Sequence, residues 1–165
     1  MRATFLAAAA VLSASPSLAA AQLANRAISV ESGVSTPLQG RGPAAAAFAV
    51  SASGWIDGFE EGDLEGVFRV AFASAPETTG RASTVHATAG LRWSLGRAPL
   101  RPQLFADLGW ARLRGGTASD RVAFGLGAGL EWFPALDVSV SARASLRVAG
   151  PDLAAEAVVG VAAYF

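Results

Sequence analysis

The segment from Val138 to Val148 alternates apolar and polar residues without a break, with Val, Ala and Leu on one parity and Ser and Arg on the other. Because successive side chains of a strand point to opposite faces, the pattern predicts a strand with one apolar face and one hydroxylic, cationic face. In a soluble sandwich the apolar face packs inside, whereas in a barrel embedded in lipid it looks outward and the polar face fills the interior. The rest of the chain must decide which face meets water.

The same period of two recurs along the chain and predicts eight strands, at 24–34, 44–56, 64–73, 83–95, 100–113, 121–132, 138–148 and 153–165. A tilted membrane-crossing strand needs about nine to eleven residues, while a soluble strand usually has about five or six. An even number of strands predicts both chain ends on the periplasmic side. The inner turns are then expected at 57–63, 96–99 and 133–137, and the outer loops at 35–43, 74–82, 114–120 and 149–152.

The polar face of these strands is made of small residues and balanced charges. Its charged residues are five acids, Glu31, Glu65, Asp107, Glu131 and Glu156, and five arginines, Arg69, Arg92, Arg101, Arg143 and Arg147. Equal opposite charges suit a closed interior, where an unpaired charge is costly. The glycines at 125, 127 and 129 weaken a strand unless something crowds their face, as happens inside a narrow eight-stranded barrel.

Aromatic residues gather near the strand ends, as expected where amphipathic rings meet lipid headgroups. One predicted girdle contains Trp55, Trp93, Trp132, Phe133, Tyr164 and Phe165, and the other contains Phe72, Trp110 and Phe124. A secreted soluble β-sandwich or cup-shaped barrel explains the alternation equally well. It explains the long strands and the cancelling charges less easily, so we predict an eight-stranded antiparallel up-and-down transmembrane β-barrel, an all-β fold.

The composition agrees with a membrane protein, since hydrophobic residues make up 52% of the chain and charged residues only 16%. Thirteen basic residues, all arginine, balance thirteen acidic ones, so nucleic acid is not expected as a partner. The absence of cysteine excludes disulfides and thiol chemistry. The start of the chain, MRATFLAAAAVLSASPSLAAAQ, has the order of a signal peptide cleaved after Ala21. We therefore expect a signal peptide at 1–21 and one barrel domain at 22–165.

The second half of the chain resembles the outer-membrane β-barrels of the opacity-protein and OmpA-like group of Gram-negative bacteria. The resemblance covers 83–165 and rests on LRPQLFADLGWARLRGG, on the glycine-rich strand with its Glu-aromatic end, and on the final strand. The matching positions are Gly125, Gly127, Gly129, Glu131, Trp132 and Pro134. It implies location in the outer membrane, contact with outer-membrane lipids, and recognition by the barrel-assembly machinery through the last strand ending at Phe165. The family includes anchors, adhesins, immune-evasion proteins and small channels.

Candidate chemistry is sparse. His86 is the sole histidine, and a lipid A-modifying enzyme needs a histidine facing lipid with a hydroxyl nearby, but parity places His86 inside. Five acids, Asp57, Glu60, Glu61, Asp63 and Glu65, miss the spacing of a calcium loop and are expected as a solvated turn. We expect no catalytic, cofactor-binding or metal-binding residues and no enzyme activity. The predicted role is structural or surface-interactive, with an unknown surface ligand. A small porin-like solute channel is the alternative, and a lipid A-modifying enzyme is a further one.

Overall fold

The structure, a computed structural model, describes residues 26–38, 43–59, 61–77, 80–114 and 119–165. The signal peptide expected at 1–21 lies outside these residues. The eight strands are β1 (Arg26–Pro37), β2 (Ala45–Phe59), β3 (Gly62–Glu77), β4 (Gly80–Leu95), β5 (Leu100–Arg114), β6 (Ser119–Ala135), β7 (Val138–Ala149) and β8 (Asp152–Tyr164). The described ranges contain no helix that is long and apolar enough to cross a membrane.

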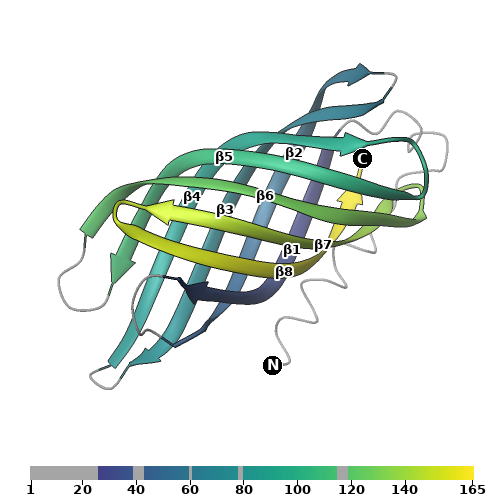
Figure 1. Cartoon of the computed structure of the whole chain (residues 1–165). Coiled ribbons are helices and arrows are strands. Elements are labelled where there is room, and N and C mark those ends of the chain that lie inside the picture. The colour runs from purple at the N-terminus through teal and green to yellow at the C-terminus, as the bar shows by residue number, and fades with distance from the viewer. Residues whose placement is uncertain (1–25, 39–42, 60, 78–79, 115–118) are drawn as a thin grey trace.

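The eight strands form one closed barrel in which each strand pairs antiparallel with the next in sequence (Figure 1). The barrel closes where β1 pairs with β8, from Ala27 opposite Tyr164 to Pro37 opposite Ala154. Closure leaves no strand edge along the barrel wall, which is the condition for a sheet to exist in hydrocarbon. The predicted fold class is therefore confirmed. We call the end that holds the C-terminus the periplasmic end, and the opposite end the loop end.

The apolar face of each strand forms the outside of the barrel. Leu108, Leu126 and Val140 are 59%, 55% and 40% exposed, respectively. On the opposite face, Arg143 and Glu131 are only 8% and 1% exposed. This distribution is the reverse of a water-soluble protein and answers the question raised by the segment from Val138 to Val148. Its apolar side chains look outward, so the soluble sandwich is excluded.

The hairpins are tighter than predicted. The segment 57–63 was expected as an inner turn, yet β2 and β3 remain paired out to Phe59 opposite Gly62. On the loop end, β3 and β4 pair out to Glu77 opposite Gly80, inside the outer loop expected at 74–82. Acidic and glycine residues are depleted in strands, so their cluster in the sequence predicts a turn. A hairpin that extends into water tolerates them because neither of its faces needs to be apolar.

The aromatic girdle expected at the periplasmic end is partly wrong. Trp132 and Phe165 are exposed on the outer face, together with the half-buried Trp93. Phe133 and Tyr164 lie on the interior side, and Trp55 has the interior parity of β2 although it is 51% exposed. A β-bulge follows Trp55, which lies opposite the interior residue Glu65. Near the loop end, Phe72, Trp110 and Phe124 are exposed on the outer face as predicted.

Candidate functional site

The polar interior of the barrel is the candidate site, and its centre is an ion-paired cluster of three arginines and three acids. We call this set the central cluster: Glu31, Arg69, Asp107, Arg143, Arg147 and Glu156. Glu31 accepts from Arg69 Nε at 3.1 Å and also pairs with Arg143. Glu31 is 1% exposed, so it holds two guanidinium groups away from water.

The other half of the central cluster is organised around Arg147. Its two terminal nitrogens donate to the two carboxylate oxygens of Asp107, each at 3.0 Å. This bidentate geometry matches the planar fork of arginine to the carboxylate. Arg147 Nε also lies 3.1 Å from Glu156 Oε2, and Glu156 pairs with Arg69. Every charge in the central cluster therefore has an opposite partner, as a buried charge requires.

A second group, the mouth cluster, lies toward the periplasmic end and consists of Asp63, Glu65, Arg92, Arg101, Gln103, Glu131 and Tyr164. Arg92 pairs with Glu65 and donates to Ser53 at 3.1 Å. Tyr164 shares the interior face of β8 with Glu156 and Gly160, and its hydroxyl there donates to Glu131 at 2.8 Å. The Glu131 carboxylate thus accepts hydrogen bonds from neutral donors, which also include Gln103 at 2.5 Å and Ser139.

Aromatic rings cover the mouth cluster at the periplasmic end. The guanidinium of Arg101 lies 4.6 Å from the centre of the Phe133 ring and 3.3 Å from Asp63 Oδ2. Phe133 in turn lies 5.4 Å from Tyr164, ring centre to ring centre. The cation over the ring and the tilted ring pair are both favourable arrangements. Sequence parity identified the charges, but these contacts had no local signal.

The glycine row of β6 exists because the interior is crowded. A Cβ on Gly125 would lie 2.6 Å from Asp107 Oδ1, and one on Gly127 would lie 2.4 Å from Phe105 Cζ. A Cβ on Gly129 would lie 2.6 Å from Arg143 Cγ. A larger residue at Gly125 or Gly129 would displace groups that form the ion pairs. The prediction that these glycines line a crowded interior is confirmed.

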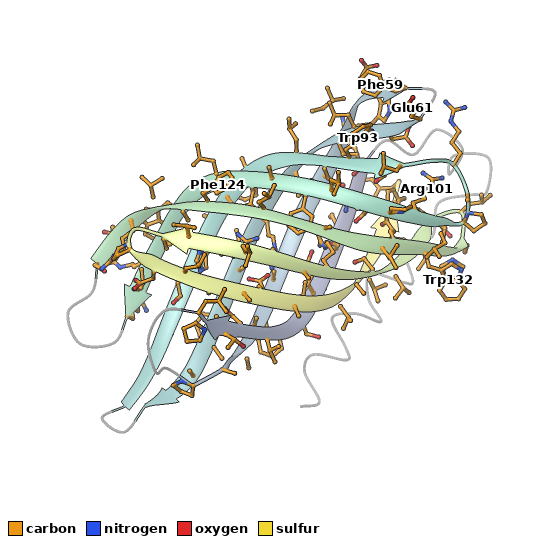
Figure 2. The ribbon with its side chains drawn as sticks, viewed as in Figure 1. Phe59, Glu61, Trp93, Arg101, Phe124 and Trp132 are labelled. Atoms are coloured by element: carbon orange, nitrogen blue, oxygen red, sulfur yellow. The ribbon has the colours of Figure 1, made fainter. Side chains whose placement is uncertain are left out.

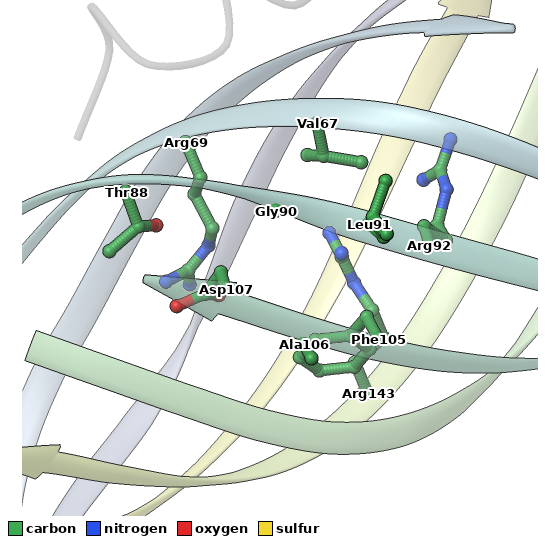
Figure 3. Close-up of a pocket in the computed structure, with 10 residues that line it drawn as sticks. All are labelled: Val67, Arg69, Thr88, Gly90, Leu91, Arg92, Phe105, Ala106, Asp107 and Arg143. Carbon is green, nitrogen blue, oxygen red and sulfur yellow. The ribbon is translucent and has the colours of Figure 1, made fainter. Parts of the chain in front are cut away.

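The space left between the two clusters is small. Figure 3 shows it among Arg69, Arg92, Arg143 and Thr88, and its volume is about 20 Å³. Such a volume has room for about one or two water molecules and none for a cofactor. Several polar atoms on its walls have no partner among the described residues, including Thr88 Oγ1 and Arg69 Nη1. Around this space, the described residues form a packed polar core that leaves no room for a solute larger than water.

Alanines of β5, β6 and β7 line one side of the interior at the loop end. Ala111, Ala123 and Ala149 form a buried cluster, with exposures of 0%, 1% and 6%. A wide water-filled lumen would expose these side chains, because water would reach them from inside. His86 lies on the same interior face, opposite Ala71 on β3 and Ala111 on β5. Parity placed His86 in the interior, and the structure confirms that position.

The acids expected as a solvated turn are divided between two environments. Glu65 and Asp63 face inward and pair with arginines of the mouth cluster, whereas Asp57 and Glu61 are exposed. Glu60 lies outside the described residues. Among the residues that the structure describes, no three His, Cys, Asp or Glu side chains converge as a metal site would require. The expectation of one solvated turn therefore holds only for the exposed members.

The fold and the interior together define the class: an eight-stranded transmembrane β-barrel with an apolar exterior and an ion-paired core. Searches against models of protein families and against curated protein sequences find no match. Among solved structures, the chain is similar to Neisserial surface protein A, at 17% identity and a TM-score of 0.61, covering 85% of this chain and 96% of that one.

Two other solved structures have the same fold. Ail, the attachment invasion locus protein of Yersinia pestis, is 14% identical, with a TM-score of 0.59 over 86% of this chain and 99% of that one. The outer membrane enzyme PagL is 15% identical, with a TM-score of 0.59 over 82% of this chain and 98% of that one. Such low identities establish the fold and no activity. The chain thus has the fold of eight-stranded outer-membrane β-barrels, as the sequence predicted.

Proposed function

We propose that this barrel is a structural or surface-interacting component of the outer membrane whose interior is plugged. The observation that carries the proposal is the packing of the interior along the axis: buried alanines at the loop end, then the central cluster, then the mouth cluster beside Phe133. An eight-stranded barrel is only just wide enough for its own side chains. A rigid network of ion pairs suits a wall element better than a conduit for solutes.

The expected result for the purified protein in planar lipid bilayers is an absence of conductance steps. The physical reason is that an ion would have to break buried pairs such as Arg147 with Asp107 to pass. The measurement is single-channel recording, with a protein-free refolding mixture as the baseline. Reproducible steps that track the amount of folded protein would overturn the plugged interior and favour the small solute channel.

The surface-interaction role draws support from the comparisons and from the loop end. Ail was crystallised with a heparin analogue, sucrose octasulfate. The loop end of this chain carries Arg112 and Arg121, which pair with Asp120 at 3.8 Å and with Asp152 at 3.4 Å. These partly exposed pairs are weak and can exchange for an external anion. The surface ligand that we infer is therefore a polyanion held at the rim of the barrel.

We also propose that the chain is not an enzyme, although PagL shares its fold. The interior position of His86 supports this, since a histidine that acts on lipid must reach the outer face. We expect His86→Ala to leave the lipid A profile of cells that express the barrel unchanged. Mass spectra of extracted lipid A give the measurement, with cells that lack the barrel as the reference. An acyl-chain difference present with the native chain and absent with His86→Ala would establish the enzyme instead.

The last strand supports recognition by the barrel-assembly machinery as a further part of the proposal. The outer face of β8 carries Val159 and Val161, and Phe165 follows at the end with 49% exposure. Phe165 N donates to Arg26 O at 2.9 Å, so the final residue remains attached to β1. This apolar, accessible end is the feature that an insertion factor in the periplasm would bind.

A further inference from the structure

A groove on the outer face of the barrel lies at its periplasmic end. It is lined by Phe59 and Glu61 from the β2–β3 turn and by Leu64 and Trp93, which lie opposite each other on β3 and β4. Its volume is about 530 Å³, within the range of small-ligand sites. Phe59, Glu61 and Trp93 lie together near the tip of the β2–β3 hairpin (Figure 2). The groove therefore opens where the apolar wall meets the membrane surface.

The walls of this groove combine apolar surface with two polar groups. Phe59 is 46% exposed and supplies an apolar wall with Leu64. Trp93 Nε1 is buried and has no acceptor among the described residues. A buried indole N–H without an acceptor is costly, so a slight turn of the Trp93 ring that brings Nε1 to an external acceptor in the groove stabilises the site.

Among the described residues that line the groove, Glu61 carries the one charge. Its backbone oxygen accepts from Gly96 N at 2.7 Å, which fixes the β2–β3 turn against the β4–β5 turn. Glu61 belongs to none of the ion pairs found among the described residues, and it is exposed. The carboxylate is therefore available to a cation from outside the chain. A suitable occupant has an apolar chain, a hydrogen-bond acceptor and a cationic group, in that order toward the water.

We propose that this groove binds a phospholipid with an ethanolamine headgroup from the periplasmic leaflet. The acyl chain lies against Phe59 and Leu64, an ester or phosphate oxygen accepts from Trp93 Nε1, and the ammonium donates to Glu61. Indole rings are favoured at headgroup level for this reason. A glycerol headgroup brings no cation to Glu61, and its phosphate is repelled by the carboxylate. A choline headgroup has a cation but no N–H to donate.

The test is native mass spectrometry of the folded barrel in detergent with equal amounts of phosphatidylethanolamine and phosphatidylglycerol. We expect the ethanolamine lipid to be bound in about threefold excess, the ratio that one exposed ion pair provides. Glu61→Gln should bring the ratio to about one, while Trp93→Phe should lower retention of both lipids. Heat-modifiable electrophoretic mobility verifies that each variant is folded.

The matched control is Asp137→Asn, which removes an acid from the β6–β7 turn at the same end but outside the groove. It should keep the preference of the native chain. Equal binding of the two lipids by the native chain overturns the proposal, as does an equal loss in Glu61→Gln and Asp137→Asn. Spectra that show paired barrels without lipid would assign the groove to a second copy and also overturn it.

Discussion

Replacing Glu31 with alanine should lower the free energy of unfolding by about 3 to 5 kcal/mol, the cost of leaving buried charges without their partner. Glu31 is 1% exposed and is shared by Arg69 and Arg143. Both guanidinium groups would lose a carboxylate in a place that water scarcely reaches. The effect should exceed that of any surface charge, because solvent screens the latter.

The measurement is urea unfolding of the barrel refolded into lipid vesicles, followed by tryptophan fluorescence. Asp120→Ala is the matched control, since Asp120 lies 3.8 Å from Arg112 and both side chains are about half exposed, at 56% and 44%. Its removal should change the free energy of unfolding by less than about 1 kcal/mol. If the two variants lost the same stability, the interior pairs would not be the source of the rigidity that we assign to them.

Gly109→Ala should prevent most molecules from folding, because it should lower the free energy of unfolding by about 3 kcal/mol or more. A Cβ at Gly109 would lie 2.1 Å from Ala87 O and 2.7 Å from Thr88 Cα, both backbone atoms of β4. Neither atom can move without opening the β4–β5 ladder. The glycine thus permits the close approach of two strands in a tightly curved wall.

Gly66→Ala is the comparison, because its added Cβ would meet the tip of a flexible side chain, Ile56 Cδ1, at 3.3 Å. We expect this variant to refold to the same yield as the native chain. The folded fraction is read from the difference in electrophoretic mobility between heated and unheated samples. Equal refolding yields for Gly109→Ala and the native chain would show that the wall relaxes more easily than its geometry indicates.

The sequence predicted the strands and their faces well because the period of two is a local property. The alternation of apolar and polar residues along a strand such as β7 shows which side chains meet lipid, whichever strand lies beside it. The five acids and five arginines placed inside by parity are there, and the glycines of β6 face them. Strand ends were less accurate, since Asp57 and Gly58 belong to a paired hairpin.

The partners of the charged groups could not be predicted, because they depend on distances across the barrel. Arg69 on β3 meets Glu31 on β1 and Glu156 on β8, neither of which is on an adjacent strand. The shear and cross-section of the closed barrel decide such contacts. Parity alone places Tyr164 inside, on the face of Glu156 and Gly160, but its contact with Glu131 on the non-adjacent strand β6 could not be predicted.

The seam between β1 and β8 makes the whole barrel depend on its last residues. All other ladders join strands that follow each other in the sequence, but this one joins the two ends of the chain. A polypeptide terminated before β8 would leave the backbone groups of β1 and β7 unsatisfied in hydrocarbon, where each costs several kcal/mol. A premature stop codon near the 3′ end of the gene is therefore as damaging as one near the start.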